Sequence, residues 1–114
     1  TLTIVMGKDN KLVYYIGQTD KTYMENGIDG SPKLDIYGGK GIRKAILKQK
    51  EFVAQRVKNP EKEGLTVLIK AYKSANYKNV VDILDEMAIT KPRTYAMVDM
   101  TPADVKMLED KKIK

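Results

Sequence analysis

The first sixteen residues carry apolar side chains in two short β-rich runs that are separated by turn-forming residues. Leu2 and Ile4 lie on one side of the first run, and the residues at 7–10 (Gly-Lys-Asp-Asn) readily form a turn. The second run, 12–16, has apolar groups on both faces, so the pattern predicts a β-hairpin that is covered on both sides. The cover is either the rest of the domain or a partner protein.

A helical period begins at Ile42 and predicts a helix that continues to about Lys58. The helix is expected to stop before Asn59-Pro60, because proline disfavours helical backbone in the residue that precedes it. Lysines occupy the outer face of this helix. The inner stripe consists of Ile42, Ala45, Ile46, Gln49, Phe52, Val53 and Val57.

The stretch from residue 65 to residue 88 changes from a strand pattern to a helix pattern. Leu65–Ile69 is apolar and β-branched, which is typical of a buried strand. Asn76 is placed to cap the helix that follows. Asp82, Asp85 and Glu86 are expected to face solvent. The apolar stripe expected to face the sheet consists of Val80, Val81, Leu84, Met87 and Ala88.

The C-terminal part of the chain predicts one more strand and a short helix. Tyr95–Met100 has a strand pattern, and Asp99 within it is expected to have a lysine partner. Thr101 and Pro102 are typical of a helix start, with threonine as the cap and proline at the first helical position. Residues 103–114 are predicted to form a short helix and a lysine-rich tail that frays.

Residues 17–41 are interpreted as a long insertion loop that holds a short strand at 34–37. Gly38-Gly39-Lys40-Gly41 opens the following helix, where free backbone N–H groups and a lysine can bind phosphate. The spacing does not fit a P-loop, because Gly41 stands where serine or threonine should follow the lysine. A plain helix entry is therefore the favoured interpretation.

The predicted order of elements is β-β-α-β-α-β with a short terminal helix, which indicates an α+β fold. Right-handed crossovers would place both long helices on the same face of a single small mixed sheet. We expect one domain over residues 1–102, followed by the terminal helix and tail at 103–114. The opposite face of the sheet would be exposed or covered by a partner.

The composition argues against an enzyme. The chain has no histidine and no cysteine, which removes the commonest general base, the thiol nucleophile and most zinc ligand sets. Its two serines, Ser31 and Ser74, do not lie in a nucleophile elbow. We expect no catalytic residue, no metal site and no cofactor.

The net charge of +6 at pH 7 favours anionic neighbours such as lipid head groups, cell-wall polymer or nucleic acid. A basic α+β module that stacks RNA bases on strand tyrosines is one alternative. Tyr14, Tyr15 and Tyr95 lack the sequence context of such modules, so we do not expect nucleic acid as the partner.

The segment VLIKAYKSANYKNVVDILD resembles the signature of the ExbD/TolR family, the small subunits of proton-driven motors in the bacterial inner membrane. In that family a strand ends in Ala-Asp-Lys, a tyrosine opens the helix and paired valines follow. This chain has Tyr72 in place of the aspartate. The residues that carry the pattern are Ala71, Lys73, Tyr77, Val80, Val81 and Leu84.

The resemblance implies a periplasmic domain of a single-pass inner-membrane protein, closer to ExbD than to TolR. No segment of the chain reaches the roughly 20 apolar residues that span a bilayer. The transmembrane helix with its proton-carrying aspartate is therefore expected upstream of Thr1. The partners implied are a second copy, an ExbB-like membrane subunit and a TonB-type protein that opens outer-membrane transporters.

In this interpretation the domain does no chemistry and transmits force by offering a sheet edge or groove to an extended partner segment. The residues expected to contact the partner are Tyr14, Tyr15, Tyr95 and Met97. A TolR-like subunit that acts on envelope integrity and binds peptidoglycan is the alternative within the family.

Overall fold

The computed structural model describes residues 1–16, 24–25, 28–29, 32–55, 57–59 and 64–114, so most of the predicted insertion loop lies outside the described residues. The elements are β1 (Leu2–Met6), β2 (Lys11–Ile16), β3 (Met24–Glu25), β4 (Ile28–Asp29), β5 (Lys33–Ile36), α1 (Ile42–Ala54), β6 (Thr66–Ala71), α3 (Tyr77–Thr90), β7 (Thr94–Met97) and α4 (Pro102–Asp110).

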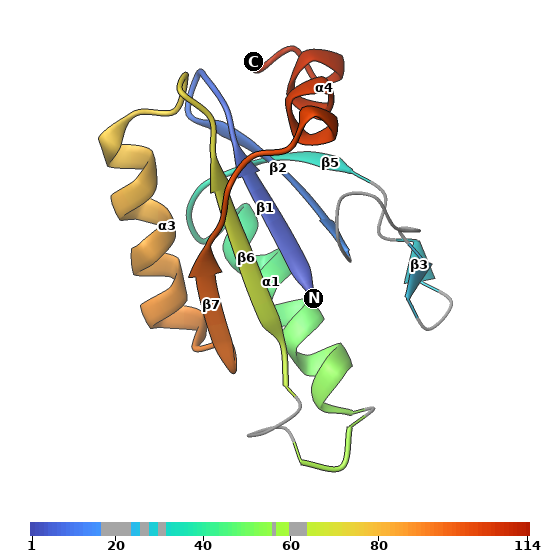
Figure 1. Ribbon diagram of the computed structural model, residues 1–114. Coiled ribbons are helices and arrows are strands. Elements are labelled where there is room, and N and C mark those ends of the chain that lie inside the picture. The colour runs from blue at the N-terminus through green and yellow to red at the C-terminus, as the bar shows by residue number, and fades with distance from the viewer. Residues whose placement is uncertain (17–23, 26–27, 30–31, 56, 60–63) are drawn as a thin grey trace.

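Five strands form one mixed sheet in the order β5-β2-β1-β6-β7, which confirms the predicted α+β class (Figure 1). β1 pairs antiparallel with β2 and parallel with β6, and β7 continues parallel to β6. The predicted hairpin is present. Its turn residues Asp9 and Asn10 have φ of 61° and 56°, the geometry of the hairpin turns that match strand twist. β3 and β4 pair with each other in a separate ribbon.

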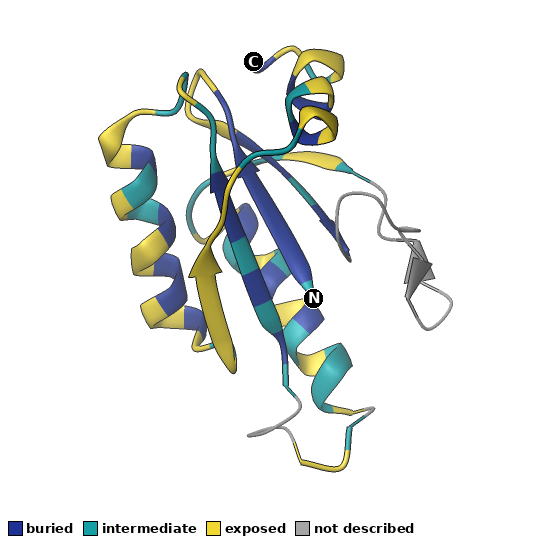
Figure 2. Cartoon of the chain, viewed as in Figure 1, coloured by how far each residue is buried: buried dark blue, intermediate teal, exposed yellow. Residues whose placement is uncertain are grey.

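The two long helices, α1 and α3, cover one face of the sheet, as predicted. β1 is buried along its whole length between the layers (Figure 2). α3 begins at the cap predicted from the sequence, because the side chain of Asn76 accepts a hydrogen bond from Asn79 N at 2.8 Å. The core under these helices consists of Leu2, Ile4, Met6, Leu12, Ile16, Ile42, Ile46, Leu65, Val67, Ile69, Ile83 and Met87.

The predicted inner stripe of α3 is wrong in part. Val81, Leu84 and Ala88 are exposed, whereas Ile83 and Glu86 face the core. The helix is apolar on more than one side, so the sequence alone allowed two orientations. The structure selects the one in which Glu86 reaches an arginine on α1. Glu86, predicted to face solvent, is therefore buried.

Two strand and helix bounds also differ from the prediction. α1 ends at Ala54 rather than near Lys58. The last strand ends at Met97, so Asp99 lies beyond it and is exposed. The short strand predicted at 34–37 is present as Lys33–Ile36. Among the described residues, no helix is both long and apolar enough to cross a bilayer.

The second face of the sheet is covered at one end by α4, which packs across from the two long helices (Figure 1). This helix begins at the predicted cap, since Thr101 Oγ1 accepts from Asp104 N at 3.3 Å. The buried cluster beneath it consists of Val5, Val13, Tyr15, Met107, Leu108 and Ile113. At this end the fold covers the face with its own helix, which differs from the prediction of a partner or solvent there.

The predicted fraying of the C-terminal tail is not observed at Ile113. Its side chain is 2% exposed, and its carbonyl oxygen accepts from Lys8 N at 2.6 Å. Gly7 lies so close to this carbonyl that a Cβ at position 7 would collide with it. One apolar residue within a run of lysines therefore fastens the chain end to the hairpin turn.

Candidate functional site

β7 is one of the two edge strands of the sheet, and its four residues are all exposed (Figure 2). Tyr95 and Met97 expose 48% and 49% of their surface. They pair in register with Val67 and Ile69, so their side chains lie on the face that carries α1 and α3. Both predicted contact residues of this strand are therefore accessible and lie on the same face.

The backbone N–H and C=O groups of Tyr95 and Met97 point away from the rest of the sheet. Thr94 N and Val98 N donate to carbonyl oxygens at the β6 side, at 3.4 and 2.9 Å. Because backbone groups alternate in direction along a strand, the N–H and C=O groups of residues 95 and 97 point to the open edge. No other described strand pairs with that edge.

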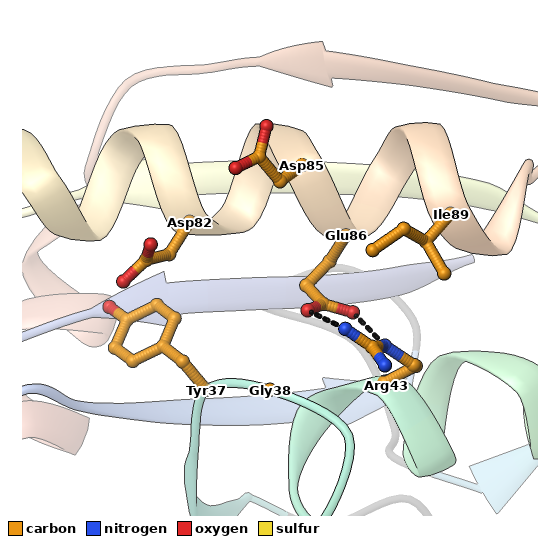
Figure 3. Close-up of a pocket in the computed structure, with 7 residues that line it drawn as sticks. All are labelled: Tyr37, Gly38, Arg43, Asp82, Asp85, Glu86 and Ile89. Atoms are coloured by element: carbon orange, nitrogen blue, oxygen red, sulfur yellow. Dashed lines mark hydrogen bonds and ion pairs between the residues drawn. The ribbon is translucent and has the colours of Figure 1, made fainter.

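A second exposed apolar feature runs along α3, which lies alongside β7 (Figures 1 and 3). Tyr77 is 82% exposed, and Val81 and Leu84 are each 37% exposed. With the exposed Ala88, these residues recur at the spacing of one helical stripe. We call this set the α3 stripe: Tyr77, Val81, Leu84 and Ala88. It contains three of the residues that carry the family pattern.

The remaining residues of the family pattern have other positions. Ala71 ends β6 and Val80 packs, half-buried, against the first core. Lys73 is exposed and holds its Nζ 5.8 Å from the centre of the Tyr72 ring. The tyrosine that replaces the family's aspartate therefore contacts the neighbouring lysine as an aromatic ring rather than as a charge.

The structure does not bring the hairpin tyrosines to this surface. Tyr15 is fully buried under α4, and its hydroxyl donates to Asp104 Oδ1 at 2.9 Å, so its prediction as a contact residue is wrong. Tyr14 is half-buried against the first core, and burial followed by the charge of Asp35 raises its pKa. Both lie on β2, which is separated from β7 by β1 and β6.

An acidic hollow of about 350 Å³ lies between α3 and the entry to α1 (Figure 3). Arg43 holds Glu86 by two hydrogen bonds, Nε to Oε2 at 2.7 Å and Nη2 to Oε1 at 2.9 Å. Asp82 lies opposite the hydroxyl of Tyr37. The hollow is lined by Tyr37, Gly38, Arg43, Asp82, Asp85, Glu86 and Ile89.

The hollow contains a protonated phenol and a paired carboxylate and guanidinium. Burial, followed by the negative charge of Asp82, raises the pKa of Tyr37, so its phenol stays protonated. Glu86 is engaged with Arg43, whose pKa that hydrogen bond raises. Within the described ranges, no three histidine, cysteine, aspartate or glutamate side chains come together as metal ligands. The bidentate pair instead joins α1 to α3.

A buried ion pair joins the sheet to α4, and only the helix cap at Thr101 could have been read from the sequence. Lys70 Nζ lies 2.6 Å from Asp104 Oδ2, and both side chains are almost fully buried. Burial alone would raise the pKa of Asp104, but hydrogen bonds from Lys70, Thr101 and Tyr15 outweigh it and lower that pKa. The carboxylate therefore stays charged and holds α4 on the sheet.

Comparison with known proteins found no match for this chain among protein-family models, curated proteins or solved structures. The geometry of the chain itself is therefore the basis for assigning a function.

Proposed function

We propose that this chain is a non-enzymatic docking domain that binds an extended polypeptide segment along the outer edge of β7. The observation that carries this proposal is the open edge of β7. There the backbone N–H and C=O groups of Tyr95 and Met97 point outward, and their apolar side chains are exposed. An added strand would satisfy those groups through backbone hydrogen bonds and demand little of the partner's sequence.

The β7 edge lacks the usual protection against strand addition. Natural edge strands are commonly blocked by a charged side chain, a proline or a covering element. β7 has the sequence Thr-Tyr-Ala-Met, with neither a charge nor a proline. The α3 stripe beside it extends the apolar surface, so a segment paired with β7 can also pack side chains against the helix.

The wider role that we propose follows from the resemblance of residues 67–85 to the ExbD/TolR signature. In that role the domain lies in the periplasm, belongs to a proton-driven inner-membrane motor and passes force to a TonB-type protein for outer-membrane transport. The segment added at β7 belongs either to that protein or to a second copy of the chain, and an ExbB-like subunit is engaged outside this domain.

A TolR-like role in envelope integrity is the second candidate, and the net charge of +6 favours it because peptidoglycan is anionic. Sedimentation of the purified domain with isolated cell wall separates the two roles. An RNA-binding module has less support, since Tyr15 is buried and Tyr14 packs against the core, which leaves no adjacent pair of strand tyrosines for base stacking.

The test places a photo-crosslinking amino acid at Tyr95 in the complete gene product, expressed in its own cells. We expect crosslinks to a second copy or to a TonB-type protein. Lys106, exposed on α4, provides the matched control position and should give none. Equal crosslinking from both positions, or none from Tyr95, would contradict the proposal.

A further inference from the structure

A small pocket of about 140 Å³ lies between β2 and α1, on the far side of the sheet order from β7. Its walls are largely apolar, and it is distinct from the acidic hollow and from the β7 edge. Among the lining residues, Ile16 and Phe52 are apolar, and Tyr14, Lys33, Lys48 and Gln49 are polar.

Gln49 is the unusual member of this lining. It lies on the inner stripe of α1 between apolar neighbours, and only 7% of its surface is exposed. Its Nε2 has no hydrogen-bond partner among the described residues. A buried amide donor without a partner lowers stability, so a residue of this kind on a core stripe needs a reason. An acceptor that enters the pocket would supply the missing hydrogen bond.

The charged groups of the lining are all cationic. Lys33 of β5 and Lys48 of α1 are exposed at the pocket, and neither forms an ion pair with another described residue. Asp35, two residues from Lys33, affects the pKa of Tyr14 but does not line the pocket. Two ammonium groups and an amide donor together favour an anionic acceptor over a neutral one.

The volume limits the size of the group that fits. Drug-sized ligands occupy pockets of roughly 300 Å³ or more, whereas an engineered cavity of about 150 Å³ in another protein holds a single benzene molecule. The pocket of about 140 Å³ therefore has room for one ring or one branched aliphatic group.

We propose that this pocket binds a carboxylate carried on an apolar group of about the size of a benzene ring. The apolar group packs against Ile16 and Phe52, and the carboxylate accepts from Gln49 Nε2 and lies near Lys33 and Lys48. The ligand is either a free carboxylic acid or an acidic residue beside an apolar residue in a polypeptide, since both present the same chemistry. This site does not depend on the docking edge at β7.

The test is a titration of the ¹⁵N-labelled 114-residue chain with benzoate, followed by NMR. We expect a saturable shift of the Gln49 side-chain amide signals. Benzyl alcohol, which has the same ring without the charge, should bind at least about tenfold more weakly. Gln49→Leu removes the donor and should weaken benzoate binding by about tenfold while the chain stays folded.

A second variant keeps the test independent of core packing. Lys33→Glu combined with Lys48→Glu reverses two exposed charges and should abolish benzoate binding. Lys44 is exposed on α1 outside the pocket, so Lys44→Glu is the control and should leave most of the benzoate binding unchanged. Benzoate shifts that do not saturate, or that neither Gln49→Leu nor the double reversal changes, would overturn the proposal.

The source of the carboxylate is decided by comparing benzoate with the peptide acetyl-Asp-Phe-Asp-amide. Tighter binding of the peptide, with loss on Gln49→Leu, indicates an acidic segment of a polypeptide. Binding of benzoate alone indicates a free carboxylic acid. Absence of binding by both probes would contradict the site itself.

Discussion

At the scale of single residues, Asp104 has three structural roles. It caps α4 through Thr101, pairs with the buried Lys70 and accepts a hydrogen bond from Tyr15. A buried charge is tolerated only when it is paired and hydrogen-bonded, and these three contacts meet that condition for the Asp104 carboxylate. The three contacts come from β2, β6 and the start of α4, and together they fix the helix on the sheet.

Replacing Asp104 with asparagine should lower the free energy of unfolding by about 3 kcal/mol, because it leaves the Lys70 ammonium buried without its counter-charge. Tyr15→Phe removes a hydrogen bond to this ionised carboxylate and should cost about 2 kcal/mol. Urea unfolding at pH 7 measures both. An Asp104→Asn protein as stable as the original would show that the pair contributes little.

The lowered pKa of Asp104 determines how its contribution to the free energy of unfolding changes with pH. The carboxyl binds a proton more readily in the unfolded chain than in the folded one, so its stabilisation is present above the ordinary aspartate pKa of about 3.9. It is lost as the pH falls through the lower folded-state pKa. Thermal unfolding between pH 6 and pH 2 should therefore show a steeper acid loss for the original chain than for Asp104→Asn.

At the scale of elements, local signals predicted what depends on neighbours in sequence. The hairpin turn at Asp9–Asn10, the capping box from Thr101 to Asp104 and the strand β6 were all predictable, because turn and cap chemistry acts within a few residues. The start of α1 at Ile42 followed from its apolar period.

Elements whose orientation depends on distant partners were not predictable in the same way. α3 carries apolar residues on two sides, and in the observed orientation Glu86 contacts Arg43, which lies 43 residues away in the sequence. Nothing near Lys70 in the sequence indicates that it is buried in an ion pair, because its partner Asp104 lies on α4, 34 residues away. Tyr15 was predicted to be a contact residue because α4, which buries it, is distant in the sequence, with Asp104 lying 89 residues away.

The α3 stripe should contribute to docking rather than to folding. Leu84→Gln removes apolar surface next to β7 and should lower the yield of crosslinks from Tyr95 several-fold, with a change of unfolding free energy within about 0.5 kcal/mol. Lys78→Gln, also exposed on α3 but off the stripe, is the control and should change neither. Equal effects of the two variants would exclude the stripe from the interface.

At the scale of the whole molecule, the two faces and the two ends of the sheet have different environments. α1 and α3 pack on one face, α4 covers one end of the other, and β1 at the centre is entirely buried. Both edge strands are largely exposed, but β5 carries the charged residues Lys33 and Asp35, whereas β7 has no charged residue and is flanked by apolar side chains. An open edge strand without charged side chains is the feature that a docking domain needs.

The most direct measurement compares Met97→Pro with Met97→Ala in the complete protein, using the crosslink from Tyr95. Proline removes the outward N–H at position 97 and leaves the bonds from Thr94 and Val98 to the β6 side in place. Alanine shortens the side chain but keeps the N–H. We predict that the proline variant folds and loses the crosslink, whereas the alanine variant retains most of it. Retention of the crosslink in a folded proline variant would contradict strand addition at β7.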